Sequence, residues 1–209
     1  MTATQALLAF GLAAGLLTLT PGLDTALVLR TAATGGPRRA FAAAVGIGAG
    51  CMIWGLAAAC GAGALLTAST LAYGVLQGAG AAYLLWLGIG LILRPRQGFE
   101  ADTATPAGGG LSAALRRGLL TNLLNPKVGV FYISFLPQFI PHGAPPASFG
   151  ALLAGLHVVM GLVWSSLLIA ATVPLSGLLQ RPAVVRALDR ITGGVFIAFG
   201  LRLVLDRRG

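Results

Sequence analysis

Residues 40–93 read AFAAAVGIGAGCMIWGLAAACGAGALLTASTLAYGVLQGAGAAYLLWLGIGLIL, without a single Asp, Glu, Lys, Arg or His. A helix needs about 20 apolar residues to cross the hydrocarbon core of a bilayer. The stretch therefore predicts two membrane spans joined by a tight turn near Thr67 to Thr70. A second stretch, residues 128–180, contains no Asp, Glu, Lys or Arg and predicts two more spans around a proline-rich loop from Pro141 to Pro146.

The composition of the whole chain also indicates a lipid environment. Of its 209 residues, 56% are hydrophobic and only 9% are charged, whereas soluble domains carry about 25% charged residues. We predict an all-α integral membrane protein, one domain over residues 1–209, with about six transmembrane helices. Their expected ranges are 5–29, 40–66, 70–93, 113–136, 148–173 and 183–205. The apolar N-terminus lacks the basic segment of a signal peptide and is expected to remain as the first span.

The basic residues produce a net charge of +9, but they form short clusters between apolar spans. This pattern argues against a nucleic-acid-binding face and instead predicts cytoplasmic loops of a multi-pass protein in a bacterial inner membrane. The N-terminus is then expected outside. Six spans would also place the C-terminus outside, where Arg207 and Arg208 are unfavourable. The clusters are Arg30, Arg38 and Arg39; Arg94, Arg96, Arg116 and Arg117; and Arg181, Arg186 and Arg190.

A polar segment at 94–112 divides the spans into two groups of three, in half-repeats 1–93 and 113–209. It is expected to be a cytoplasmic linker. Three spans per half mean that the second half enters the membrane in the opposite direction, which predicts two inverted repeats. In such folds, corresponding spans interrupted by Pro or Gly mark the substrate site. Thr20-Pro21-Gly22 and Asn125-Pro126-Lys127 interrupt the first span of each half.

Both interruptions place a capping residue, Thr20 or Asn125, before a proline at the expected first position of a new half-helix. Proline frees carbonyl groups one turn back, and free backbone groups at membrane depth are tolerated only in a protein interior or a water-filled cavity. We therefore expect Pro21, Gly22 and Pro126 to break their helices and to direct two helix N-termini at one cavity. The alternative is that each proline only kinks its helix.

Two ionisable residues lie within a turn of these breaks. We treat Asp24 as the only acidic residue in the predicted spans, and Lys127 is the only lysine in the chain. A zwitterionic amino acid would match this pair, with its ammonium on Asp24 and its carboxylate on Lys127 or the amides after Pro126. Asp24 could bind a proton when the substrate leaves. The alternatives are that Asp24 stabilises a helix N-terminus and that Lys127 extends to the cytoplasmic interface.

Other polar and small residues of the spans have simpler interpretations. Asn122 and Asn125 could bind substrate or the freed backbone, and His157 is expected to make a hydrogen bond between helices, outside the site. Cys51 and Cys60 lie nine residues apart on one helix and cannot pair. Close helix packing is the role expected for the glycines Gly46, Gly48, Gly50, Gly193 and Gly194.

Two other functional classes fit the residues less well. An intramembrane hydrolase needs a second carboxylate, a metal cluster or a nucleophile with its base, so we expect no enzyme. An exporter of metal ions or other small cations is the closer alternative, but it would need several converging Asp, His or Cys ligands. We expect no metal and no cofactor.

At these residues the chain resembles, along its full length, the LysE/RhtB family of bacterial amino-acid exporters. The resemblance is carried by TPGLD at 20–24 with Gly36, Arg38-Arg39-Ala40 and Gly46, by AYLLWLG at 82–88, and by GLLTNLLNPK at 118–127 with LPQF at 136–139. Leu23 departs from the family, which usually has a second proline there, so a milder first break is expected.

The resemblance implies efflux of amino acids or close derivatives, driven by the proton-motive force, through about six helices and without an organic cofactor. The expected partners are an amino-acid substrate, protons and the lipid bilayer. A single site carboxylate favours a neutral cargo over a dibasic one. The exact amino acid stays open, as does the oligomeric state, a homodimer included.

Overall fold

The computed structural model describes residues 1–20, 22–68, 70–95, 110–171 and 181–205, and every regular element within them is helical. The all-α prediction is therefore confirmed for this part of the chain. In order, the elements are α1 (Ala3–Leu19), α2 (Leu23–Gly35), α3 (Pro37–Ala68), α4 (Thr70–Leu93), α5 (Leu111–Leu123), α6 (Pro126–Val130), the π-helix η1 (Phe131–Phe135), the 3-10 helix η2 (Leu136–Phe139), α7 (Pro146–Ala170) and α9 (Pro182–Leu205).

The helix boundaries follow the predicted spans closely. The turn expected near Thr67 to Thr70 falls between α3 and α4, and the expected proline-rich loop lies between η2 and α7. Most of the linker predicted at 94–112 lies outside the described residues, as do Pro21 and the arginines Arg207 and Arg208. The expectations for those positions stay predictions.

Local chemistry explains several helix ends. At the start of α1, the Thr2 hydroxyl accepts a hydrogen bond from the Gln5 amide while the Gln5 side chain accepts one from the Thr2 amide. Such a capping box satisfies two of the four amides that a helix start leaves free. Between α2 and α3, Gly36 has a φ of 80°, which glycine adopts readily. Pro37 then begins α3 with its φ already helical.

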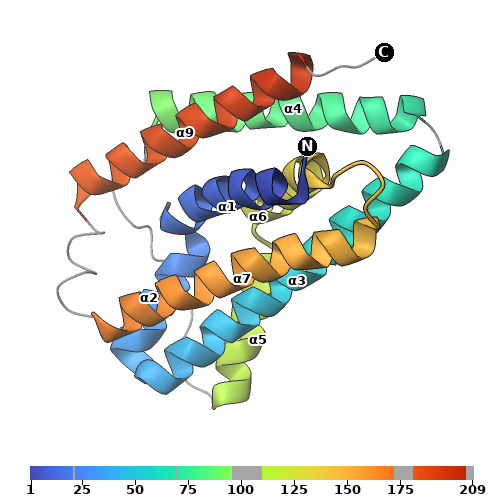
Figure 1. Ribbon diagram of the computed structural model, residues 1–209. Helices are drawn as coiled ribbons and strands as arrows, with labels where there is room; N and C mark the ends of the chain where they lie inside the picture. The colour runs from blue at the N-terminus through green and yellow to red at the C-terminus, as the bar shows by residue number, and fades with distance from the viewer. Residues whose placement is uncertain (21, 69, 96–109, 172–180, 206–209) are drawn as a thin grey trace.

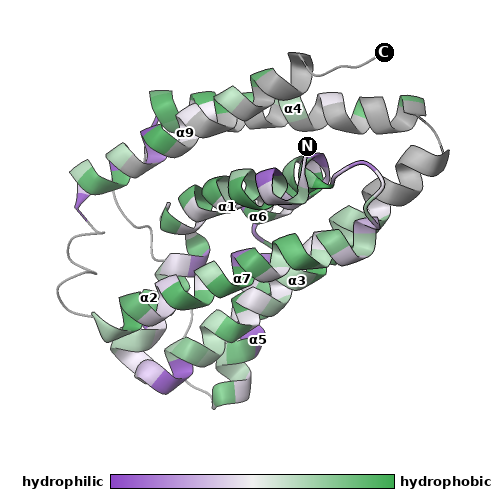
Figure 2. Ribbon diagram, viewed as in Figure 1, coloured by the Kyte–Doolittle hydropathy of each residue, from purple (hydrophilic) through white to green (hydrophobic). Residues whose placement is uncertain are grey.

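The described helices are apolar enough for lipid contact. Two of them, α3 over Pro37–Gly61 and α7, could each cross a membrane alone, and the bent pairs α1–α2 and α5–η2 raise the number of candidate spans to four. Figure 2 shows hydrophobic residues along the helices and hydrophilic ones mainly near helix ends and loops. Leu8 and Leu12 on α1 are 70% and 68% exposed, which suits a surface that faces lipid.

Helix α3 lies at the centre and packs against α2, α5 and α7, while α4 and α9 lie side by side as a separate layer (Figure 1). The backbones of α3 and α5 touch at two places. A methyl group at Gly46 would overlap the Leu115 carbonyl, and one at Gly118 would overlap the Ala43 carbonyl. In the outer layer, Gly88 and Gly193 meet in the same way. Small residues allow this approach, which helps membrane helices associate.

The glycine predictions are confirmed at four of five positions. Gly46 and Gly193 contact backbone, Gly48 faces Val158, and Gly50 faces the Asn122 side chain. Gly194 was predicted wrongly, because a Cβ atom added there would meet nothing within 4 Å among the described residues. Only one of two adjacent helical residues can face a given neighbour, and in α9 that residue is Gly193.

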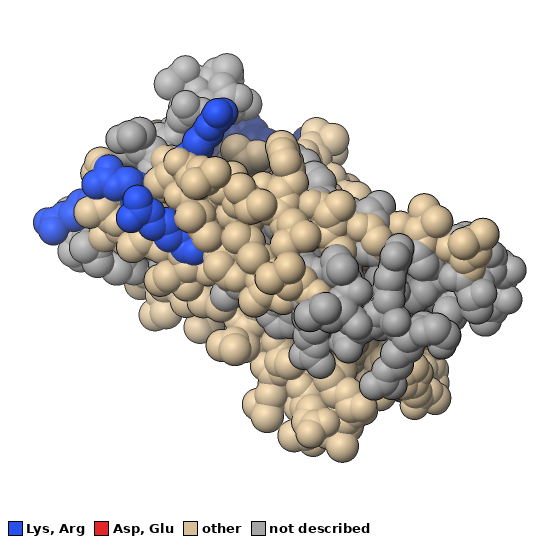
Figure 3. Space-filling view, turned by 90° about the horizontal axis from the view of Figure 1, so that it is seen from above, with Lys and Arg blue, Asp and Glu red and all other residues tan. Residues whose placement is uncertain are grey.

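The two ends of the bundle differ in charge. Figure 3 shows basic side chains gathered toward one end. In Figure 1, that end holds the α2–α3 turn and the start of α9, whereas the α3–α4 turn lies at the opposite end. Arg38 and Arg39 belong to the first turn of α3, and Arg181 precedes α9. We call this the basic end.

The half of the bundle away from the basic end is filled by aromatic rings. Phe10 of α1 packs on Phe131 and Phe139, with ring centroids 5.9 and 5.7 Å apart, and Phe135 stacks on Phe131 at 5.1 Å. All four are buried, and we call them the aromatic core. They pack with Ala59 of the second half of α3 and with Leu153 of the first half of α7.

Candidate functional site

The first helix break lies between α1 and α2, which are bent by 51°. Thr20 ends α1: its amide and its hydroxyl both donate to the Leu16 carbonyl, at 3.0 and 2.7 Å. The N-cap of α2 is Gly22, without a side-chain cap, and α2 begins at Leu23. The prediction that Thr20 caps the second half-helix is therefore wrong, because the residue at the N-cap of α2 is Gly22. The chain bends between α1 and α2, whereas Pro21, where the break was predicted, lies outside the described residues.

The second break lies between α5 and α6, where the chain bends by 59°. Here the predicted chemistry is confirmed. Asn125 is the N-cap of α6, its Oδ1 accepts a hydrogen bond from the Lys127 amide at 3.2 Å, and Pro126 is the first helical residue. The first bend is the smaller of the two. Both predicted interruptions thus produce new helix N-termini.

The cap at Asn125 gives a direct prediction. We expect Asn125→Ala to lower the free energy of unfolding by about 1 kcal/mol, because the Lys127 amide loses its acceptor. Asn125→Ser keeps an acceptor and should retain most of the stability. The measurement is an SDS titration of the purified protein in detergent. Equal unfolding midpoints for the Ala and Ser variants would show that the cap has no such role.

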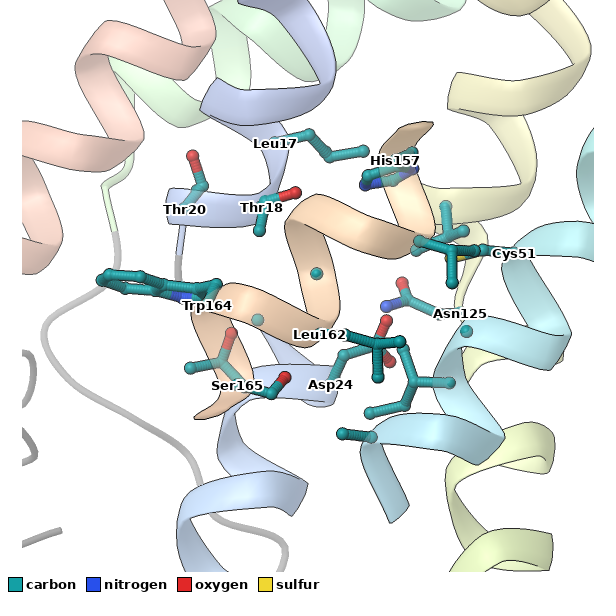
Figure 4. Close-up of a pocket in the computed structure, with 18 of the residues that line it drawn as sticks. Leu17, Thr18, Thr20, Asp24, Cys51, Asn125, His157, Leu162, Trp164 and Ser165 are labelled. Carbon is teal, nitrogen blue, oxygen red and sulfur yellow. The ribbon is translucent and has the colours of Figure 1, made fainter. Parts of the chain in front are cut away.

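Both new N-termini line one cavity of about 80 Å³, room for several water molecules, since one water needs about 10–15 Å³. Figure 4 shows it between α1, α2, α3 and α7. The α3 residues that line the cavity belong to the first half of that helix, and most of the lining residues of α7 belong to its second half. The cavity therefore lies on the basic-end side of the aromatic core. Of the predicted site residues, it is lined by Thr20, Gly22, Asp24, Asn125 and Lys127.

The Asp24 carboxylate accepts a hydrogen bond from Asn122, a residue that does not itself line the cavity and that links three helices. The Asn122 side chain of α5 is completely buried, and its Nδ2 donates to Asp24 Oδ2 at 2.8 Å and to Cys51 Sγ of α3 at 3.4 Å. The other carboxylate oxygen, Oδ1, is shielded and has no hydrogen-bond partner among the residues that the structure describes. Asp24 therefore keeps acceptor capacity beside the cavity.

Lys127 supplies the opposite charge. It occupies the first turn of α6, lines the same cavity as Asp24, and lies close enough for its charge to act on the Asp24 carboxyl. An acid and a base thus meet where two helix N-termini converge. The nearby Cys51 thiol is free, as is that of Cys60, in agreement with the prediction that the two cannot pair.

Sequence reasoning missed the contribution of α7. His157, Gly161, Trp164 and Ser165 line the cavity, and their spacing is that of one helix face. That periodicity, started from His157, is the signal that could have found them. The expected hydrogen bond between helices is present, with Tyr132 Oη and His157 Nδ1 2.8 Å apart. His157 also lines the cavity, although the sequence analysis placed it outside the site.

A second buried acid also escaped the sequence argument. Asp189 lies within the last predicted span and in α9, and it is completely buried. The prediction of a neutral cargo assumed a single carboxylate in the spans and did not include Asp189. Asp189 is not among the residues that line the cavity, so Asp24 is the only carboxylate among the described lining residues. Within the described ranges, no three His, Cys, Asp or Glu residues lie together as a metal site would require.

Comparison with known proteins gives a consistent result. Residues 16–207 match the family described as LysE type translocator. The chain is 32% identical to a leucine efflux protein of Klebsiella pneumoniae, over 88% of both chains. It is 30% identical to a homoserine/homoserine lactone efflux protein of Salmonella typhimurium, over 95% of this chain and 96% of that one. No solved structure matches.

Proposed function

We propose that this chain, which belongs to the family of LysE type translocators, exports small neutral amino acids or close derivatives from the bacterial cytoplasm in exchange for protons. Relatives that align over nearly their full length are named for efflux of leucine and of homoserine or its lactone. The observation that carries the proposal is the cavity where both helix breaks meet and where Asp24 and Lys127 face the same space.

The charges of the cavity suit a zwitterion. The substrate ammonium would bind Asp24, whose Oδ1 has no other partner within the described residues, and the carboxylate would bind Lys127 and the amides at the start of α6. A dibasic cargo would need a second acid. Apolar walls from Leu17, Val158 and Leu162 offer the side chain an uncharged surface, which favours a neutral amino acid.

The same carboxyl group offers a route for coupling. A charged group at membrane depth is expensive unless it is neutralised. Asp24 would be neutralised by the substrate ammonium on the way out and by a proton on the way back. Such an exchange links one substrate export to one proton import. The metal-export alternative lacks support, since Asp24, Cys51 and His157 do not form a ligand group.

An inverted repeat of six spans would explain the arrangement of the helices. In that scheme α1–α2 corresponds to α5–α6, α3 to α7, and α4 to α9. The close packing of α3 on α7 and of α4 on α9 supports this scheme, because a symmetry axis between the halves places the helices beside it against their own counterparts. The basic end would face the cytoplasm by the positive-inside rule, so the cavity would open from that side in this conformation.

Inside-out inner-membrane vesicles test the proposal. Respiration acidifies their interior, and we expect vesicles containing this protein to accumulate labelled L-leucine or L-homoserine but not L-lysine. A protonophore should abolish the accumulation, because the proton gradient drives it. Vesicles without the protein are the control. Transport of neither neutral amino acid, or transport indifferent to the protonophore, would contradict the proposal, and accumulation of divalent metal ions would support the alternative.

A further inference from the structure

We infer that His157 is a substrate-binding residue whose Nε2–H donates a hydrogen bond to the carboxylate of the exported amino acid. The inference rests on the proposed function and adds a recognition element from α7, on the opposite wall of the cavity from Asp24. Figure 4 shows His157 and Asp24 on different helices around this space, with Cys51 beside them. No residue of α7 was part of the predicted site.

The ring of His157 is oriented by a line of buried polar groups. Asn122 donates to Cys51 Sγ at 3.4 Å, the Cys51 thiol lies against the Tyr132 hydroxyl, and Tyr132 Oη lies 2.8 Å from His157 Nδ1. The Cys51, Tyr132 and Asn122 side chains are buried. The line therefore runs through the protein interior from α5 through α3 and η1 to α7.

The contact between Tyr132 Oη and His157 Nδ1 is compatible with two tautomers of His157, and we infer the one in which Tyr132 donates. Asn122 Nδ2 donates to Cys51 Sγ, and the nitrogen of a neutral imidazole is a stronger acceptor for the Tyr132 O–H than a thiol sulfur is. Tyr132 then donates its O–H to His157 Nδ1. A neutral imidazole that accepts at Nδ1 carries its proton on Nε2. The ring edge turned away from Tyr132 is then a donor, and His157 lines the cavity.

The surroundings leave room for a ligand at this donor. Gly161 follows one turn later on the same face of α7, and a Cβ atom added there would meet nothing within 4 Å in the part of the chain that the structure describes. Lys127, the other donor expected for the carboxylate, lines the same cavity. A carboxylate has two oxygens, so it can accept from both groups at once. Asp24, an acceptor, remains for the ammonium.

Two substitutions distinguish the roles of the two ring nitrogens of His157. Asn at position 157 places its amide near the position of Nδ1, so His157→Asn keeps a partner for Tyr132 and loses the cavity donor. Gln reaches the position of Nε2, so His157→Gln keeps that donor. The assay is competition with labelled L-leucine in the vesicles, or with L-homoserine if that is the amino acid carried. The competitors are the unlabelled amino acid and its carboxamide, which lacks the carboxylate.

We expect the wild-type protein to prefer the amino acid over its carboxamide, and His157→Asn to reduce that preference about tenfold, the loss of one hydrogen bond to a charged group. His157→Gln should restore most of it. A merely structural role would lower the amount of folded protein and leave the preference unchanged. An unchanged preference in His157→Asn, or equal loss in both variants, would overturn the inference. Failure of the wild-type protein to transport any amino acid would instead overturn the proposed function.

Discussion

Asp24→Asn is expected to reduce proton-driven accumulation of the amino acid in inside-out vesicles by about a hundredfold or more, since a charged hydrogen bond and the coupling group are lost together. The substitution should leave the fold intact. An amide has nearly the shape of a carboxylate, and its oxygen can still accept the hydrogen bond that Asn122 donates at 2.8 Å. The loss would therefore report on charge rather than on packing.

The matched control for this variant is Asp24→Glu, which keeps the charge on a longer side chain. We expect it to retain measurable accumulation at reduced affinity. Both variants should elute from size-exclusion chromatography at the wild-type position. Accumulation at the wild-type level by Asp24→Asn would show that the carboxylate only stabilises the start of α2, the structural alternative raised by the sequence.

Gly118→Val should prevent folding, with an expected loss of about 3 kcal/mol or more from overpacking. A single methyl group at Gly118 would already overlap the Ala43 carbonyl. Backbone cannot rotate aside as a side chain can, so α5 would have to separate from α3. The measurement is the yield of monodisperse protein after extraction in detergent.

Gly155→Val is the matched control, because Gly155 lies within α7 and a side chain added there would meet nothing within 4 Å. We expect nearly normal yield from this variant. Nearly normal yields of both variants would mean that the contact between α3 and α5 is not required. A low yield of both variants would mean that added bulk is tolerated at neither glycine.

Much of the fold could be predicted because lipid imposes strong rules on sequence. The uncharged stretches located α3, α4 and α7, and Asn125-Pro126 located a helix start to the residue. Local chemistry was less decisive at the first break. Thr20 and Asn125 both precede proline, but Thr20 ends α1, where its hydroxyl donates to the Leu16 carbonyl, and the N-cap of α2 is Gly22.

The cavity could be predicted only in part. Asp24 and Lys127 stood out because charge is rare in a membrane span. His157, Cys51 and Tyr132 come together through the packing of α7 and η1 on α3, and a sequence does not reveal which helix faces meet. The π-helix at Phe131–Phe135 has no sequence signal of its own, because its five residues are compatible with an ordinary helix.

The glycine contacts determine which parts of the molecule can move. Two helices that touch backbone to backbone, as α3 and α5 do at Gly46 and Gly118, and as α4 and α9 do at Gly88 and Gly193, cannot slide past each other without collision. Each pair therefore behaves as a rigid body. If the chain exports its substrate as proposed, the hinges are expected in the bent segments around Gly22 and Asn125 and in the irregular turns of η1 and η2.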